Sequence, residues 1–199
     1  MASRTSISTF AQHEHLVTNR TTLNADLSLA AFRGRVFVGP RARWQWKATE
    51  RVSLSSSYAR LHQFAQSLRN QESITGTVFP VELYIGAGGP AIPVARSEQG
   101  IVSAAYHMSR GLRLSAEAFT RRVNGIVLVA ANNTEPFATH ASAVGGGMIR
   151  GVGVDASMSG SRYGVVVSYG RQRVRYVAGG MSYVPEHGAT HTFEGGVTA

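Results

Sequence analysis

The chain has 199 residues, of which 43% are hydrophobic and 16% are charged, enough apolar material for one ordinary domain. It has no cysteine, which excludes disulfide scaffolds, thiolate metal sites and cysteine nucleophiles. The net charge of +9 suggests nucleic acid or an anionic surface as a binding partner. However, the basic residues, which are all arginines except Lys47, are spread along the sequence. Because the only tight alternating set is Arg171, Arg173 and Arg175, no compact basic patch is evident.

Alternation of apolar and polar residues is the main secondary-structure signal, because successive side chains of a strand point to opposite faces. The 22 glycines and 6 prolines also favour β structure over a helical bundle. The longest stretch without a formal charge, residues 136–149, is too short for a membrane-spanning helix. In chain order, the predicted strands cover residues 5–16, 21–32, 35–47, 51–62, 99–108, 112–122 (with an extension toward 130), 144–158, 162–176 and 190–198.

The connections between these strands are of two kinds. Tight turns are predicted at residues 17–20, 48–50, 109–111 and 159–161, all at one end of the sheet. Long loops are predicted near residues 63–98, 131–143 and 177–189 at the other end, where the break at 33–34 is the one tight link. Membrane barrels have this asymmetry of short turns and long loops. We therefore predict an all-β, antiparallel meander of long strands that forms part of a transmembrane β-barrel.

Several segments resemble the barrel of TonB-dependent outer-membrane receptors. A Pro-Arg strand, a short turn and a strand with a Ser-Tyr-Ala-Arg segment follow one another in residues 39–63. Further similar pieces open a descending strand at 96–99 and close ascending strands at 114–122 and 166–171. Together these pieces cover most of residues 20–199.

The resemblance implies a role in nutrient uptake across the bacterial outer membrane, without enzymatic activity. Its implied partners are outer-membrane lipid, the rest of the barrel, a plug domain, the TonB system through that plug, and a small nutrient ligand. From the sequence we expect this chain to lack the export signal, TonB-binding segment, plug domain and terminal aromatic residue of this family. We therefore expect residues 1–199 to be an interior part of a receptor barrel that is inactive alone.

The resemblance also assigns the two faces of the segment 35–47. The lumen-facing residues would be Arg35, Arg41, Arg43 and Lys47. The lipid-facing residues would be Val38, Ala42, Trp44 and Trp46, with the tryptophans in an interfacial girdle or, alternatively, in a soluble core. Weak candidates for ligand contact in the first long loop are Phe79, Tyr84 and Ile85.

Motifs for catalysis, metals and cofactors are weak. His13 and His15 share one strand face, but an exposed polar strand end explains them better than a metal site, and His187 and His191 are similarly ambiguous. The segment 151–156 matches the loose dinucleotide pattern, yet no helix begins after it. Hydroxyl nucleophiles lack the motifs that activate them, and Asp26 and Asp155 are the only aspartates. We expect no enzyme, no metal and no cofactor.

The alternative is a soluble basic β-domain that binds nucleic acid or anionic glycans. Arg171, Arg173 and Arg175 would share one face of a strand and follow a phosphate backbone, with Tyr169 available for stacking. The barrel interpretation expects no nucleic acid as a partner.

Overall fold

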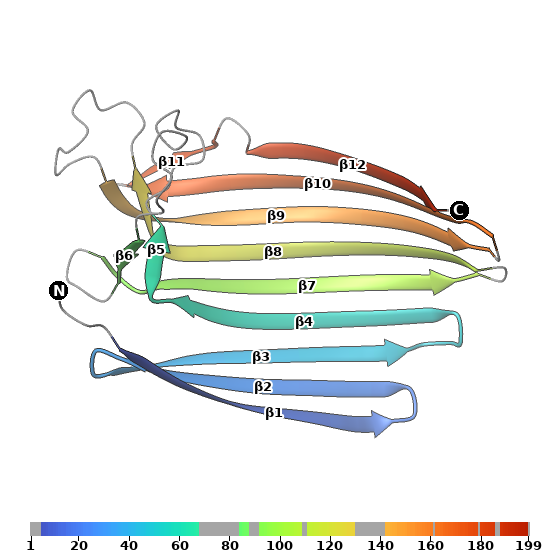
Figure 1. Cartoon of the computed structure of the whole chain (residues 1–199), viewed down its shortest axis with the longest axis horizontal. Helices are drawn as coiled ribbons and strands as arrows, with labels where there is room; N and C mark the ends of the chain where they lie inside the picture. The colour runs from blue at the N-terminus through green and yellow to red at the C-terminus, as the bar shows by residue number, and fades with distance from the viewer. Residues whose placement is uncertain are drawn as a thin grey trace.

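The computed structural model describes residues 5–67, 84–87, 92–108, 111–129, 142–160, 162–178, 180–185 and 188–198. Within these ranges the chain forms one large antiparallel sheet and a small sheet of two short strands, which confirms the predicted all-β meander (Figure 1). Its long strands are β1 (Ser6–Thr18), β2 (Thr21–Phe32), β3 (Arg35–Lys47), β4 (Val52–Gln63), β7 (Ala95–His107), β8 (Leu112–Val129), β9 (Ser142–Ser159), β10 (Gly164–Ala178) and β12 (Ala189–Thr198). The short strands are β5 (Ala65–Ser67), β6 (Tyr84–Gly86) and β11 (Met181–Tyr183). No helix suited to spanning a bilayer occurs in these described ranges.

Neighbouring long strands in the sheet are also neighbours in sequence. The order runs β1-β2-β3-β4-β7-β8-β9-β10, and β12 pairs with the free side of β10. The tight connections that follow β1, β3, β7 and β9 all lie at one end of the sheet, called the turn end here (Figure 1, right). The link between β2 and β3 lies at the opposite end, called the loop end, together with the long connections. This is the asymmetry that the sequence predicted.

The β2–β3 hairpin turns through only two residues. Arg33 and Gly34 have positive φ angles of 51° and 72°, the backbone that a two-residue hairpin requires for its twist to match the strands. Arginine pays a steric cost for a positive φ that glycine does not. The guanidinium of Arg33 lies 6.0 Å from the centre of the Phe32 ring, a cation–π distance that helps to hold this turn.

Most strands begin and end within two residues of their predicted bounds, and two strands, β7 and β8, differ in informative ways. The start predicted at residue 99 was wrong, because β7 begins at Ala95 and pairs along Arg96 and Glu98 with β4. Consecutive polar residues hid the alternation there. In β8, the register shifts between Asn124 and Ile126, and Gly125 between them has a φ of 74°. This bulge exchanges the faces of the later residues, so that β8 continues to Val129 although its pattern breaks.

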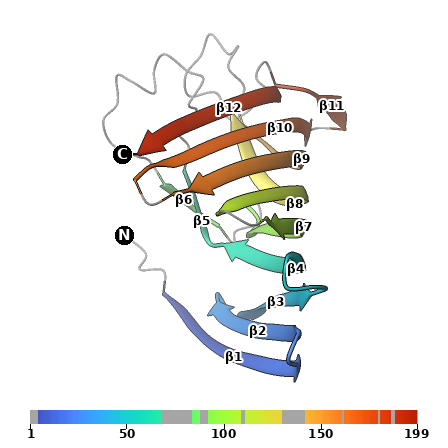
Figure 2. The ribbon, with the colours of Figure 1, turned by 90° about the vertical axis from the view of Figure 1, so that its right-hand side faces the viewer.

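The sheet has almost no interior. Among the described residues, the buried hydrophobic side chains are Phe32, Ala87 and Ala95, all near the loop end, where Phe32 and Phe37 contact Phe64 with ring centres 4.9 and 5.2 Å apart. Seen from the turn end in Figure 2, the sheet bends into an arc that does not close. Among the described strands, one edge is β1, and the other is formed by β12 and the short β11, which both pair with β10. An ordinary soluble domain buries its large apolar side chains between two layers, and a second layer is absent from the described part of this chain.

Glycines in β9 receive aromatic rings from the adjacent strands. Phe119 of β8 pairs directly with Gly151, and its ring occupies the space that a Cβ at Gly151 would need. Tyr176 of β10 does the same at Gly147, where a Cβ would lie 2.7 Å from the ring atom Cδ1. A glycine opposite an aromatic residue lets the ring lie flat on the sheet. These contacts fix the positions of the strands that flank β9.

We predict that Gly151→Ala destabilises the sheet by about 1–3 kcal/mol, because the new methyl group displaces the Phe119 ring. Gly170→Ala is the matched control, since Gly170 lies on the same face of the adjacent strand and a Cβ added there would have nothing within 4 Å. Urea unfolding of the full chain in detergent micelles, followed by tryptophan fluorescence, measures both. Equal midpoints for the two variants would contradict this role of Gly151.

Candidate functional site

The pairing register divides the side chains of the sheet between two faces. Residues that pair directly across strands point to the same side. One such row runs through Ala42, Tyr58, Gly100, Thr120, Arg150 and Arg173. The face of this row also carries Trp44 and Trp46 and is called the tryptophan face. The opposite face carries Ser53, Ser55 and Ser103 and is called the serine face.

The serine face is concave near the turn end. One hollow of about 330 Å³ is lined by side chains from β3, β4, β7 and β8, among them Arg43, Lys47 and Arg113, and it extends to the turn between β1 and β2. Within it, the hydroxyl groups of Ser55 and Ser103 form a hydrogen bond of 2.7 Å. Trp46 and Leu54 of the opposite face also contribute to the lining. A hollow shared by so many strands requires the sheet to bend around this face.

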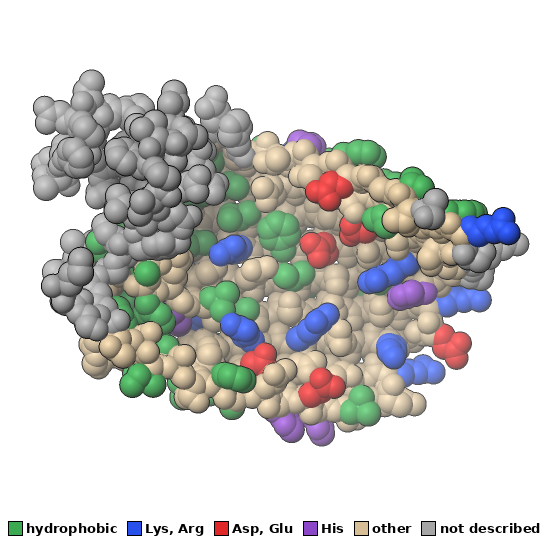
Figure 3. All heavy atoms as spheres, in the orientation of Figure 1, with side chains coloured by type: hydrophobic (Ala, Val, Ile, Leu, Met, Phe, Trp, Pro, Cys, Tyr) green, Lys and Arg blue, Asp and Glu red, His purple; other side chains and the backbone are tan. Residues whose placement is uncertain are grey.

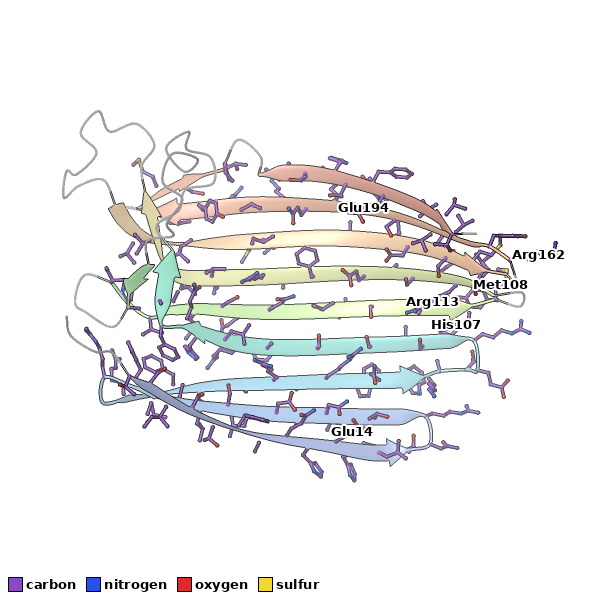
Figure 4. All side chains as sticks on the ribbon, viewed as in Figure 1. Glu14, His107, Met108, Arg113, Arg162 and Glu194 are labelled. Carbon is purple, nitrogen blue, oxygen red and sulfur yellow. The ribbon has the colours of Figure 1, made fainter. Side chains whose placement is uncertain are left out.

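Charges of both signs lie along the whole length of the serine face. Figure 3 shows this face, with acidic and basic side chains scattered among polar ones, and Figure 4 labels Glu14, Arg113 and Glu194 on it. Asp26 pairs in register with Arg41, and its Oδ1 atom is buried without a hydrogen-bond partner. The structure places all four residues predicted to face a lumen, Arg35, Arg41, Arg43 and Lys47, on this face.

The tryptophan face is apolar and exposed. Trp44 and Trp46 are each 38% exposed and stack on one another with ring centres 6.2 Å apart. Val38 and Ala42 lie beside them on the same face and are also exposed. The other exposed apolar side chains of the long strands share this face with few exceptions, which are Phe10, Leu16, Leu61 and Val166. The residues predicted to face lipid therefore share one continuous apolar surface.

Charged residues on the tryptophan face are confined to the loop end of the described strands. On β10, Val165 and Val167 precede Tyr169, and the arginines follow. On β4, Val52 and Leu54 precede Tyr58 and then Arg60. The first charged residues met from the turn end are Arg60 on β4, Glu98 on β7, Arg122 on β8, Arg150 on β9 and Arg171 on β10. On β3 the face stays uncharged as far as Val36, so the boundary runs obliquely across the rows of paired residues.

Pairing across strands collects the charged residues into what we call the arginine patch. Its members are Arg60, Arg96, Arg122, Arg150, Arg171, Arg173 and Arg175. Arg150 pairs directly with Arg173, and Met148 lies between Arg122 and Arg175 in the adjacent row. The expectation of no compact basic patch was therefore wrong. Its members come from five strands, and only the register shows that they share one face.

One acidic residue lies within the patch. Glu98 receives a hydrogen bond of 2.9 Å from Nε of Arg60, and its carboxylate also lies 2.8 Å from Nη2 of Arg60 and 3.5 Å from Nη2 of Arg96. The Tyr58 hydroxyl donates to the same carboxylate at 3.3 Å. These contacts join β4 to β7 at the border of the apolar surface. These ion pairs also explain why β7 includes Glu98, although the alternation of the sequence placed the start of this strand at residue 99.

Other predicted candidates do not form a site within the described residues. His13 and His15 stack with ring centres 6.1 Å apart, and no group of three metal-binding side chains occurs in that part of the chain. His191 accepts or donates a hydrogen bond of 2.9 Å with the Tyr169 hydroxyl. Residues 151–156, which match the dinucleotide pattern, lie inside strand β9. Tyr84 and Ile85 belong to β6, whereas Phe79 and His187 lie outside the described residues.

Comparison with known proteins supports the fold. No model of a protein family matches the chain, and no curated protein sequence matches it. Among solved structures, the chain resembles the FrpB iron transporter from Neisseria meningitidis (F3-3 variant), with a TM-score of 0.60 and 14% sequence identity. The likeness covers 88% of this chain and 26% of the transporter, so the chain spans about a quarter of that protein's length. At this identity the likeness establishes a shared fold.

Proposed function

We propose that residues 1–199 form part of the wall of a transmembrane β-barrel in the bacterial outer membrane, and that the complete barrel takes up a scarce nutrient. The exposed, continuous apolar surface of the tryptophan face carries this proposal. Exposing apolar surface to water costs about 25 cal/mol of free energy per Å², so a surface of this breadth must be shielded from water. In outer-membrane β-barrels, lipid contacts the apolar outer face, and the inner face is polar.

The oblique border of the arginine patch fits strands that tilt in a bilayer. At a tilt of about 45° and a strand spacing of about 4.8 Å, each step along a paired row changes the height by about 3.4 Å. Going from Ala42 to Arg173 takes five such steps, or about 17 Å. Val36 lies about 14 Å above Ala42 along tilted β3. The first arginines of β10 and the last apolar residue of β3 therefore lie at one level.

The height of the apolar surface also suits a membrane. On β3 this surface extends from Val36 to Trp46, about 34 Å along the strand at 3.4 Å per residue. Tilted by about 40–45°, it stands about 24–26 Å tall, close to the apolar band of about 25 Å around outer-membrane barrels. Trp44 and Trp46 lie near its turn end and Tyr58 near its loop end, where interfacial aromatic residues are expected.

In the proposed barrel, the serine face lines the lumen. Arg35, Arg41, Arg43 and Lys47 contact water or a plug domain, and the mixed charges of this face suit a polar surface of that kind. The edges β1 and β12 continue into further strands of the same barrel, because unpaired backbone groups are costly in lipid. The connections from β4 to β7, from β8 to β9 and from β10 to β12 lie on the extracellular side, where Phe79, Tyr84 and Ile85 are candidates for ligand contact.

Coupling to TonB and the choice of nutrient belong to the complete receptor. The plug domain links such a barrel to TonB, and residues 1–199 supply strands of the barrel. Because the structural neighbour is an iron transporter, an iron chelate is the first nutrient to test. The role is transport without catalysis, which accords with the weak catalytic motifs of the sequence.

The chain contains two tryptophans, and both lie on the tryptophan face, so fluorescence reports directly on membrane insertion. After refolding into phosphatidylcholine vesicles, we expect lipids brominated on their acyl chains to quench Trp44 and Trp46 strongly. Gln45→Trp in a Trp44→Phe/Trp46→Phe background is the control, because residue 45 points to the serine face. It is expected to respond to aqueous acrylamide instead. Equal quenching by bromolipid at residues 44, 45 and 46 would refute the assignment of the faces.

We predict that Trp44→Arg impairs membrane insertion, whereas Arg43→Gln leaves it nearly unchanged. An arginine on the lipid face costs up to about 2–4 kcal/mol at the middle of the bilayer. Removing a charge from the serine face avoids that cost. Flotation of refolded chain with vesicles gives the inserted fraction of each variant. Equal insertion of the two variants, or the reverse order, would be incompatible with a lipid-facing Trp44.

Uptake is tested on the complete receptor in its host. We expect cells that lack the protein to take up ⁵⁵Fe supplied as ferric citrate several-fold more slowly than the parent strain under iron limitation. Restoring the intact protein should recover the rate, and restoring a Trp44→Arg form should recover less. Unchanged iron uptake would remove iron as the nutrient, while the quenching result would still decide the membrane assignment.

A further inference from the structure

We propose that the arginine patch is a binding site for the phosphorylated headgroup of an anionic lipid in the surrounding leaflet. This inference rests on the proposed function, because it requires the tryptophan face to contact lipid. The site lies on the outer surface at the loop end of β8, β9 and β10, apart from the lumen and from any nutrient pathway. Its central members are Arg122, Arg150, Arg173 and Arg175.

The packing of like charges is the first argument. Arg150 and Arg173 are direct cross-strand partners on adjacent strands, a placement that destabilises a sheet when nothing lies between the charges. Arg122 and Arg175 lie on either side of Met148 in the next row, so four arginines occupy neighbouring positions on one face of three adjacent strands. An anion bound among them converts the repulsion into attraction.

The second argument is the lack of internal counter-charge. The patch holds seven arginines and one glutamate, and Glu98 directs its carboxylate to Arg60 and Arg96. Among the described residues, Arg122, Arg150, Arg173 and Arg175 have no carboxylate within salt-bridge distance, although Glu98 is the register partner of Arg122. All four side chains are exposed. Within the described ranges, no acidic side chain competes with an external anion for these four arginines.

The third argument is position. The patch adjoins the apolar surface directly, with Tyr169 of β10 and Tyr58 of β4 at the border. Along both strands the order is apolar, tyrosine, arginine, which matches the order of hydrocarbon, interface and headgroup in a bilayer. A phosphate on a lipid whose chains cover the apolar surface would lie at the level of the arginines. A nucleic acid bound there would leave the adjoining apolar surface in water.

The chemistry of the side chains favours phosphate. Guanidinium groups donate paired hydrogen bonds to phosphate oxygens, and arginine is less strongly hydrated than lysine. Each basic residue near an anionic membrane surface is worth about 1 kcal/mol, or about fivefold in affinity. Two arginines removed together should then weaken binding by about 25-fold.

The experiment titrates short-chain phosphatidic acid, whose headgroup is a phosphate monoester, into the full chain held in dodecyl maltoside. Calorimetry gives the dissociation constant, and phosphatidylcholine of the same chain length is the neutral probe. We expect Arg150→Gln/Arg173→Gln to weaken phosphatidic acid binding by about 25-fold. Arg41→Gln/Arg43→Gln removes the same charge from the serine face and should change binding less than twofold.

A second matched pair lies on one strand. Arg122 and Arg121 are neighbours in β8 on opposite faces, and Nε of Arg121 donates a 2.9 Å hydrogen bond to Ser97 Oγ. Arg122→Gln is expected to lose about fivefold in affinity, and Arg121→Gln is expected to match the unmodified chain. Bromolipid quenching in vesicles should be the same for all of these variants, which shows that they still insert.

The outcomes separate this inference from the proposed function. If the unmodified chain inserts but binds phosphatidic acid no better than phosphatidylcholine, or if both double variants lose affinity equally, the lipid site is refuted and the barrel wall stands. If bromolipid does not quench the tryptophan face within the complete barrel, both are refuted. Tighter binding of a single-stranded oligonucleotide than of phosphatidic acid, lost in Arg150→Gln/Arg173→Gln alone, would assign the patch to a soluble polyanion instead.

Discussion

The register of antiparallel pairing is the constraint on which this structure depends. Because side chains alternate with a period of two, a slip of one residue between β2 and β3 would put Arg43 on the face of β2 that Trp44 now shares, and would bring charged residues from one side of the slip onto the apolar face. A hydrophobic core contributes little against such a slip, since the described residues bury almost none, and the tight turns are the main restraint within the sheet. The difference between the two environments outside the sheet must therefore supply the specificity. A boundary between lipid and water supplies it on every strand at once.

Alternation in the sequence was enough to locate the long strands and the ends at which they turn. It failed where the two faces carry similar residues, as at Arg96 to Glu98, where an ion pair with Arg60 replaces hydrophobic contrast as the reason for pairing. After Gly125 a bulge reverses the faces without any change in composition, yet the predicted extension toward residue 130 is confirmed, since β8 ends at Val129. Both places lie at the loop end, where the strands leave the proposed membrane.

The arginine patch was harder to foresee for a different reason. Arg60 and Arg173 are far apart in sequence, and they meet on one surface only after five strands have paired. Each strand alone shows one or two arginines beyond an apolar run, which is an ordinary strand end. The predicted strands and turns would have placed these residues approximately, but the register needed to put Arg150 opposite Arg173 depends on the exact lengths of the turns.

An excess of arginine over lysine is also what an Arg-rich codon usage would produce, and composition alone does not distinguish that origin from a function. The positions do distinguish them. On the serine face, charged residues occur from the turn end to the loop end, with Arg113 near one and Arg121 toward the other. On the tryptophan face of the described strands, they occur only beyond Tyr58 and Tyr169. A bias in codons supplies arginine to both faces alike. Exclusion of charge from one part of one face requires a physical cause at that height, and contact with hydrocarbon is such a cause.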